Sequence, residues 1–467
     1  MLFSTFPFLC FFCAVFAVYW SLPRHRWRMA WLLVASVGFY MSWNPWLIGL
    51  IVASASIDYV VALALERPAS PRRRKLLVCL SAGANLSFLA YFKYANFFLA
   101  SAGALLQQLG LPAEDRALSV VLPLGISFYT FEAISYVVDV YRGRVRAVRN
   151  PLDYALYIMF FPHLIAGPIV RPADFLPQLG RPKRWNWDRM QLGVQFFLVG
   201  LFKKAILADH LATVADPIFA APAGWGSGAV WLGVLSYAGQ IYCDFSGYSD
   251  MAVGLAHMLG FKLPANFRRP YFAVGIGDFW RRWHISLSSW LRDYLYIPLG
   301  GGRGGRWATY RNLFLTMLLG GLWHGASWTF ILWGGYHGLL LALERAVPLP
   351  RWLRGAAWRP VLASATFLAV CVGWVLFRAQ SFADAGAVLT RLVRPVGGAA
   401  LEPTLAATAV ACLVVLFAGY IAATLLNVKQ IERRLPAPAL AAALAGLLLL
   451  TLVLFPEDGK SFIYFQF

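Results

Sequence analysis

Residues 313–343 read LFLTMLLGGLWHGASWTFILWGGYHGLLLAL, a run without a single Asp, Glu, Lys or Arg. An α-helix needs about 20 apolar residues to cross a bilayer, so this run predicts a membrane-spanning segment. His324 lies about 16 Å along such a helix from Leu313, near the middle of the membrane. Polar side chains at that depth are costly and tend to be functional. The segment therefore indicates the fold class and supplies the first candidate for chemistry.

The whole chain shares this apolar character. Of its 467 residues, 60% are hydrophobic and 13% are charged. In soluble domains roughly 45–50% of the residues are apolar and about 25% are charged. The mean hydropathy is +0.62. These values exclude a soluble enzyme and a disordered chain, and only six cysteines exclude a disulfide-rich scaffold. We predict an all-α, polytopic integral membrane protein.

Apolar stretches along the sequence predict about 10 to 12 transmembrane helices, with additional interfacial or re-entrant helices. Between Met29 and Leu65, Asn44-Pro45 and its flanking tryptophans indicate an interfacial turn that joins two passes. The prolines and glycine of residues 161–168 predict a broken or re-entrant segment. No internal repeat is visible in the sequence, which argues against transporters built from repeated halves. The other predicted spans are residues 76–92, 118–140, 152–170, 191–208, 229–261, 361–377, 405–426 and 440–455.

The charge is strongly basic, with 41 Lys and Arg against 21 Asp and Glu and a net charge of +20. Cytoplasmic loops of membrane proteins collect such residues. Basic loops also suit anionic lipid headgroups or a phosphorylated donor molecule. Residues 262–311 contain nine basic and two acidic residues. They include the run 279–291, which predicts one amphipathic interfacial helix. The glycine-rich stretch 300–306 is interpreted either as a phosphate-binding loop or as a flexible surface loop.

Candidate chemistry lies in polar residues inside apolar segments. His324 suits general-base catalysis because the unperturbed pKa of histidine is about 6.5. The glycines at 320, 321 and 325 are interpreted as leaving room for a substrate beside its ring. Asp244 and Asp250 are embedded carboxylates that either take part in chemistry or hold helices together. No histidine spacing indicates a metal site. The weaker histidine candidates are His163, His210, His257 and His337, the last of which is expected on another face of the same helix as His324.

Several long strings resemble the membrane-bound O-acyltransferase family, specifically its bacterial alginate O-acetyltransferase branch. They are DFSGYSDMAVGLAHMLGF (244–261), NFRRPYF (266–272), FWRRWHISLSSWLRDYLYIPLGG (279–301), LWHGASW (322–328) and FIYFQF (462–467). Residues 161–172 fit as well, so the resemblance covers nearly the whole chain. It implies one membrane domain over 1–467, with N-terminal helices at 1–141, a catalytic core at 142–345 and C-terminal helices at 346–467.

The resemblance also implies a reaction and two site residues. His324 matches the family's membrane-embedded catalytic histidine, and His284 matches the residue that partners it. His324 is expected to act as general base on an acceptor hydroxyl, and His284 to orient or polarise the thioester carbonyl. The donor is expected to be a cytosolic thioester such as acetyl-CoA, with no bound cofactor or metal. The residues that bind the donor are not identified.

The expected setting is a multi-pass protein of the bacterial inner membrane, surrounded by membrane lipid. Its expected partners are periplasmic or extracellular acetyltransferase proteins and an exopolysaccharide acceptor such as alginate, with no nucleic acid. The alternatives are another acceptor, such as cellulose or peptidoglycan, or D-alanyl transfer from a carrier protein. A transporter or lipid flippase, and a non-catalytic subunit of a polysaccharide-export complex, are further alternatives.

Overall fold

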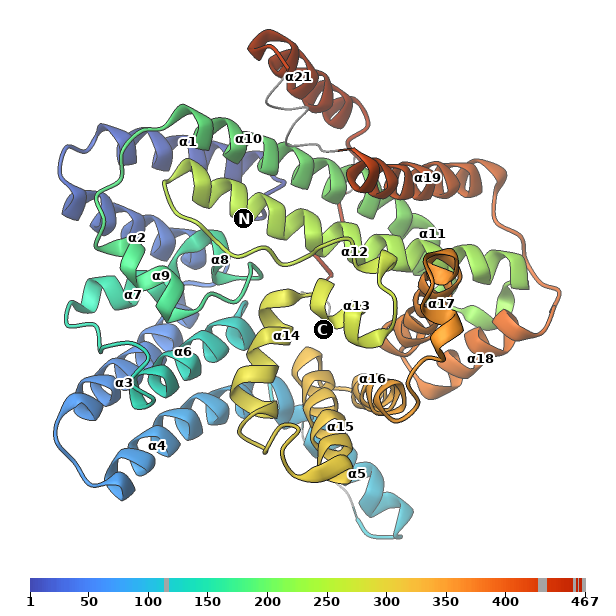
Figure 1. The fold of residues 1–467 in the computed structure, drawn as a ribbon, viewed down its shortest axis with the longest axis horizontal. Coiled ribbons are helices and arrows are strands. Elements are labelled where there is room, and N and C mark those ends of the chain that lie inside the picture. Colours follow the sequence, from blue (N-terminus) through green and yellow to red (C-terminus); the bar gives the residue numbers. More distant parts are fainter. Residues whose placement is uncertain (113–116, 427–434, 457–458, 461, 464–467) are drawn as a thin grey trace. The chain divides into compact units, whose positions relative to one another are not determined.

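A computed structural model of the chain describes residues 1–112, 117–426, 435–456, 459–460 and 462–463. Every regular element among these residues is a helix (Figure 1). The helices form two compact units, residues 1–193 with 252–264, and residues 194–251 with 265–467. The expected boundaries at 141 and 345 fall inside these units, and the single-domain assignment stays a prediction.

The first unit consists mainly of the N-terminal helices and also contains the first part of α10 and the end of α12. Its elements are α1 (Phe6–Ser21), α2 (His25–Met41), η1 (Pro45–Leu47), α3 (Ile48–Glu66), α4 (Pro71–Leu89), η2 (Ala90–Tyr94), α5 (Ala95–Gln108), α6 (Ile126–Tyr141), α7 (Pro151–Met159), α8 (Phe161–Leu164), α9 (Pro172–Leu179), and parts of α10 (Trp187–Phe202) and α12 (Ser227–Met258).

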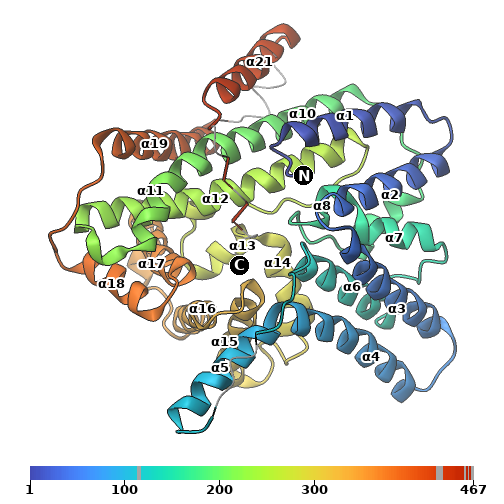
Figure 2. The ribbon, with the colours of Figure 1, turned by 180° about the vertical axis from the view of Figure 1, so that it is seen from behind.

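Helices α3, α4 and α6 lie side by side in this unit (Figures 1 and 2). The Asp58 carboxylate on α3 accepts hydrogen bonds from Ser81 Oγ (2.5 Å) and Asn85 Nδ2 (3.0 Å) on α4. Buried polar side chains that satisfy one another in this way hold membrane helices together. The predicted turn before α3 is confirmed, because the Asn44 side chain accepts from Trp46 N–H at 3.1 Å and starts η1.

The predicted break near residues 161–168 is also confirmed. The chain leaves α7, makes only the short helix α8, and then continues without regular structure to Arg171. Glu132 of α6 fastens this segment, accepting the Val170 N–H at 2.8 Å and lying 3.3 Å from His163 Nε2. The buried backbone thus finds polar partners, as irregular backbone at membrane depth must.

The second unit contains the rest of α10 and α12 and all the C-terminal elements. These are η3 (Lys203–Ala208), α11 (Asp209–Ala220), η4 (Pro222–Gly224), η5 (Pro270–Phe272), α13 (Ile276–Arg282), α14 (Ile285–Leu291), η6 (Arg292–Tyr296), α15 (Gly305–His324), α16 (Trp328–Ala346), η7 (Arg351–Arg354), η8 (Ala356–Trp358), α17 (Arg359–Arg378), α18 (Phe382–Val393), α19 (Pro403–Leu425) and α21 (Ala437–Val453).

Five helical stretches are long and apolar enough to cross a membrane, at 45–66, 71–108, 187–220, 356–378 and 403–425. Two shorter apolar helices are α1 and α21. The all-α, multi-pass membrane architecture is therefore confirmed. The count of 10 to 12 crossings stays a prediction, because several expected spans form shorter helices or helices with more buried polar residues.

The predicted single span over 313–343 is wrong, because two helices, α15 and α16, meet there at a sharp bend. Gly325 is extended (φ −165°, ψ 158°), and the Ser327 hydroxyl caps α16 by accepting the Thr329 N–H. The two helices pack along glycines: a Cβ on Gly334 would lie 2.3 Å from Met317 O, and one on Gly338 would lie 2.9 Å from Phe314 Cα. Small residues allow this close backbone approach.

Two adjacent glycines of α16 give a matched test of this packing. Gly334→Ala is expected to lower thermal stability, since its new methyl would press on the α15 backbone and overpacking costs about 1–3 kcal/mol. Gly335→Ala meets only ordinary contacts with Leu318 and Phe314, and alanine favours a helix over glycine by about 1 kcal/mol. The melting temperature in detergent should fall for the first variant and hold or rise for the second. Equal melting temperatures would contradict the glycine contact.

Candidate active site

His324 is the last residue of α15, and its imidazole is 4% exposed. The expectation that it sits in the middle of a continuous helix is wrong, because the helix ends at this residue. The C-terminal end of a helix stabilises a positive charge through the helix dipole. The position therefore favours a ring that gains a proton during a reaction.

An aromatic box surrounds this ring. It consists of Trp323, Trp333 and Phe377, whose ring centroids lie 4.9, 5.0 and 5.3 Å from that of His324. The ring centroid of His337 lies 5.0 Å from that of Trp333. Both residues are on α16, so His337 joins this aromatic cluster from a different helix than His324. The expected placement of His324 and His337 on one helix is wrong for the same reason as the single span. Aromatic walls exclude water and strengthen electrostatic interactions inside the site.

The glycines around His324 do not leave room for a substrate, contrary to expectation. A Cβ on Gly325 would lie 2.2 Å from the ring of Phe330, and a Cβ on Gly321 would lie 2.3 Å from Phe330 O. A Cβ on Gly320 would lie 3.1 Å from Leu291 Cδ1. Protein atoms fill the space that these glycines free. Their role is to bring α16 and α14 close to the end of α15.

His284 lies between two short helices rather than within one amphipathic helix. The predicted helix 279–291 is interrupted, because α13 ends at Arg282 and α14 begins at Ile285. His284 has φ +42° and ψ 55°, the left-handed region that residues with a Cβ adopt rarely. Such strain collects at functional sites and persists only where the surroundings impose it. Trp280 before the break, and Leu287 and Leu291 after it, are nonetheless buried.

The structure brings the two predicted site residues together. The ring centroids of His284 and His324 lie 6.4 Å apart, with an interplanar angle of 59°. His284 is fully buried, and Phe245 of α12 packs edge-on against it at 4.6 Å. Burial lowers the pKa of His284 to about 3, because desolvation penalises the charged ring. His284 is therefore neutral at physiological pH.

Asn266 is a site residue that the sequence reasoning quoted but did not single out. Its Oδ1 lies 3.2 Å from His284 Nδ1 and also accepts from the Ser286 backbone N–H (3.2 Å) and Ser286 Oγ (2.9 Å). Its backbone oxygen accepts the Ile285 N–H at 2.9 Å. Its Nδ2 donates to Ser249 Oγ of α12 at 3.2 Å. Asn266 thus holds both the strained backbone and the ring of His284.

The embedded carboxylates of α12 are paired with lysines of η3, which supports the helix-holding interpretation. Lys203 Nζ lies 2.6 Å from Asp250 Oδ2. Lys204 Nζ contacts Asp209 Oδ1 (2.7 Å), Asp244 Oδ1 (2.7 Å) and the Lys460 carbonyl (3.1 Å). An ammonium has three N–H donors, so these contacts use its whole capacity.

The cluster around Lys204 also binds the segment at Phe462 and Ile463. Asp244 Oδ2 accepts the Ile463 N–H at 2.7 Å, and the neighbouring Phe462 packs on Tyr248 and Phe245. Because Phe245 contacts His284, the cluster supports one wall of the site from behind. Residues 464–467 of the string FIYFQF lie outside the described residues.

The other three histidine candidates are His163, His210 and His257. His163 faces Glu132 in the first unit, and the segment of α12 that carries His257 belongs to that unit too. His210 Nδ1 lies 2.8 Å from the Ile206 carbonyl of the preceding helical turn.

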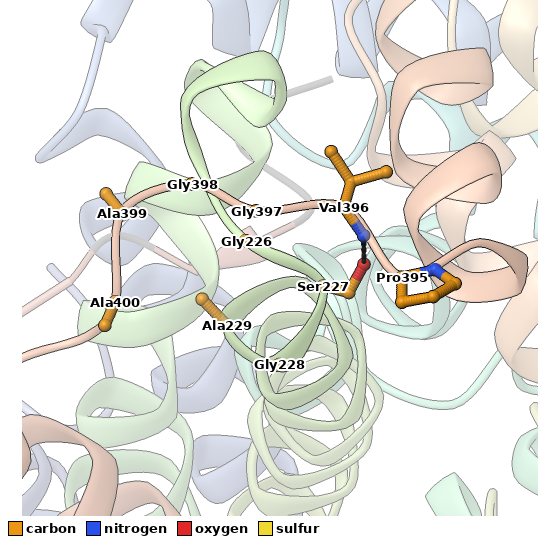
Figure 3. A pocket seen from close by; sticks show the side chains of 10 residues that line it. All are labelled: Gly226, Ser227, Gly228, Ala229, Pro395, Val396, Gly397, Gly398, Ala399 and Ala400. Carbon is orange, nitrogen blue, oxygen red and sulfur yellow. Dashed lines mark hydrogen bonds between the residues drawn. The ribbon is translucent and has the colours of Figure 1, made fainter.

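Two other features bear on where a ligand binds. The glycine-rich loop 300–306 is tied to α15 by Asn312 Nδ2, which donates to Gly301 O at 3.0 Å, while Arg303 and Arg306 are exposed. Phosphate binding there stays a prediction. A surface hollow of about 390 Å³ lies between residues 226–229 and 395–400. In it Ser227 Oγ accepts the Val396 N–H (Figure 3). Ser227 supplies the one polar side chain that lines this hollow, so the hollow offers few groups for chemistry.

Comparison with known proteins shows the family to which the chain is similar. Residues 84–383 match the model of a family described as membrane-bound O-acyltransferases. The "probable alginate O-acetylase AlgI" of Pseudomonas putida is 48% identical, covering 82% of this chain and 78% of its own length. The peptidoglycan O-acetyltransferase of Helicobacter pylori is 40% identical over 78% of this chain and 73% of its own. The teichoic acid D-alanyltransferase of Bacillus subtilis is 31% identical over 56% of this chain and 69% of its own length.

Proposed function

This chain belongs to the membrane-bound O-acyltransferase family, and we propose that it O-acetylates an exopolysaccharide such as alginate, using a cytosolic thioester donor. Membership makes it an O-acyltransferase rather than a transporter, a flippase or an assembly subunit. The 48% identity to a probable alginate O-acetylase over most of both chains supports alginate as the acceptor. The bacterial inner membrane is the proposed location, since the thioester is cytosolic and the polymer is exported.

The observation that carries the proposal is the buried pair of His284 and His324 inside aromatic walls. In the proposed reaction His324 takes the proton of the attacking hydroxyl as its oxygen adds to the thioester carbonyl carbon. The new C–O bond forms, the C–S bond breaks, and the leaving thiolate takes the proton from His324. The products are an O-acyl ester and a free thiol such as coenzyme A.

The basic region 262–311 is proposed to meet the phosphates of the donor, because arginine forks bind phosphate well. Arg303 and Arg306 are exposed and able to make such contacts. Periplasmic or extracellular acetyltransferase proteins are proposed to complete transfer to the polymer. A second candidate acceptor is peptidoglycan, which the 40% identity to the H. pylori enzyme favours.

Purified protein in nanodiscs, supplied with radiolabelled acetyl-CoA, tests donor and acceptor together. Deacetylated alginate and peptidoglycan fragments are compared, each with and without periplasmic extract from a producing strain. Label on alginate would support the proposal, and label on peptidoglycan would support the second candidate. Absence of thioester cleavage with acetyl-CoA, but cleavage of an acylated carrier protein, would overturn the proposed donor.

A further inference from the structure

The contacts around Asn266 determine which of its side-chain atoms is the oxygen. The atom that faces His284 also faces the backbone N–H of Ser286, which can only donate. An amide NH₂ in that place would oppose donor to donor, so the atom is the carbonyl oxygen. The other end of the amide donates to Ser249 Oγ, which agrees with this orientation.

An amide oxygen can only accept hydrogen bonds, so His284 Nδ1 must carry the proton in their 3.2 Å contact. In a neutral imidazole one nitrogen donates and the other accepts. Nε2 of His284 therefore carries a lone pair. Three hydrogen bonds to one oxygen, from Nδ1, Ser286 N and Ser286 Oγ, hold this arrangement.

We infer that Asn266 is a positioning residue that locks His284 in the Nδ1–H tautomer, so that His284 Nε2 accepts a hydrogen bond from the bound substrate. The inference rests on the proposed function for the presence of that substrate. Polarising a thioester carbonyl needs a donor, which a neutral ring held in this way does not present at Nε2. His284 is therefore suited to accept from the attacking hydroxyl, beside the proton transfer at His324.

The tautomer can be read without any assay of activity. Protein labelled with ¹⁵N-histidine in liposomes is examined by solid-state NMR, and the His284 signals are assigned by their loss in His284→Gln. We expect a protonated Nδ1 and a non-protonated Nε2 at pH 7. In Asn266→Leu, which removes the acceptor at similar size, we expect this preference to be lost. A protonated Nε2 in the wild type would overturn the inference.

Asn266→Asp separates positioning from a merely structural role. Its carboxylate keeps the accepting oxygens but adds a negative charge 3.2 Å from Nδ1. A neighbouring opposite charge raises a pKa by about 1 to 3, so the pKa of His284 should rise from about 3 towards 6. As the pH falls through the new value, Nε2 gains a proton and loses its lone pair. The rate at pH 5 relative to pH 7.5 should then fall by up to about tenfold compared with the wild type.

The surroundings of His284 keep this readout interpretable. The titratable group described in contact with it is His324, while Phe245 and Trp323 do not titrate. The pH profile of the variant is therefore compared with that of the wild type, and the NMR signals of His284 are followed over the same pH range. Ser249→Ala removes only the partner of the Asn266 amide nitrogen and is expected to leave the pH profile and the ring signals unchanged.

The two readouts distinguish failure of the inference from failure of the proposed function. Asn266→Leu is expected to lower the acyl-transfer rate at least about tenfold, as loss of an orienting partner does for other functional histidines. If the NMR signals follow expectation while His284→Gln and Asn266→Leu stay fully active, the positioning stands and the proposed role of His284 fails. A pKa of His284 that stays at about 3 in a folded Asn266→Asp protein, followed by its NMR signals, would contradict the positioning itself.

Discussion

Replacing His324 by alanine is expected to lower the rate of acyl transfer about 10² to 10⁴-fold, the usual contribution of general acid–base catalysis. The ring is buried at the end of α15, where the helix dipole would support the proton that it is proposed to take from the acceptor hydroxyl. Alanine leaves no group able to hold that proton. Thioester cleavage by purified protein in nanodiscs measures the effect, with thermal unfolding as the check on folding.

Two further variants make this result specific. His324→Gln keeps a polar side chain of comparable size but no base at neutral pH, so it should be as inactive as the alanine variant. His210→Ala is the matched control, because the described hydrogen bond of the His210 side chain goes to a carbonyl of its own helical stretch. Wild-type turnover by a folded His324→Ala protein would refute the assignment of the base.

The pair should also act as a unit. His284 and His324 lie 6.4 Å apart in one enclosed site, and residues that act together in catalysis give strongly non-additive losses. The double variant is therefore expected to be little slower than His324→Ala alone. If the fold-losses in rate of the two single variants multiply in the double variant, the two rings serve separate steps.

Replacing Lys204 by methionine is expected to destabilise the protein by about 3–5 kcal/mol, the usual cost of breaking a buried ion pair. Methionine has a similar length but leaves the Asp209 and Asp244 carboxylates without their cation, at side-chain exposures of 6% and 3%. The variant should melt at a lower temperature in detergent. It should also lose activity, because Asp244 anchors Ile463 behind the wall of the site.

The neighbouring residue supplies the control for this experiment. Lys203 pairs with Asp250 at side-chain exposures of 22% and 25%, where solvent screens the charges more than at Lys204. Lys203→Met is expected to cost about 1 kcal/mol or less. Equal losses of stability in the two methionine variants would show that burial does not determine how much the Lys204 cluster contributes to stability.

Much of the molecule could be predicted from local features of the sequence. Composition and hydropathy indicate a helical membrane protein, because burying that much apolar surface requires a bilayer. The Asn44-Pro45 turn and the break after Phe160 follow from prolines, whose fixed geometry and missing N–H act locally. Even the end of α15 carried a signal that the sequence reasoning passed over, since Ser327 before an apolar run is typical of a helix N-cap.

Other features have no local signal. Nothing in Trp283-His284 itself stops a helix, and the break arises where residues 266–268 bond to the backbone of residues 282 and 285. The glycines near His324 are visible in the sequence, but only the packing of α16 and α14 shows what occupies the space beside them. The partners of Asp244 and Asp250 lie on η3, more than 30 residues earlier in the chain.

The sequence by itself determined the class of the protein, its apolar helices and the two histidines, because composition, helix punctuation and long characteristic strings are properties of the chain. Only the tertiary structure decided that the two rings lie 6.4 Å apart in one buried site, that His284 is held in a strained conformation, and that Asn266 Oδ1 faces its Nδ1. The physical reason is that hydrogen bonds and ring contacts between distant segments depend on how helices pack. A pattern of residues along one segment does not contain that information.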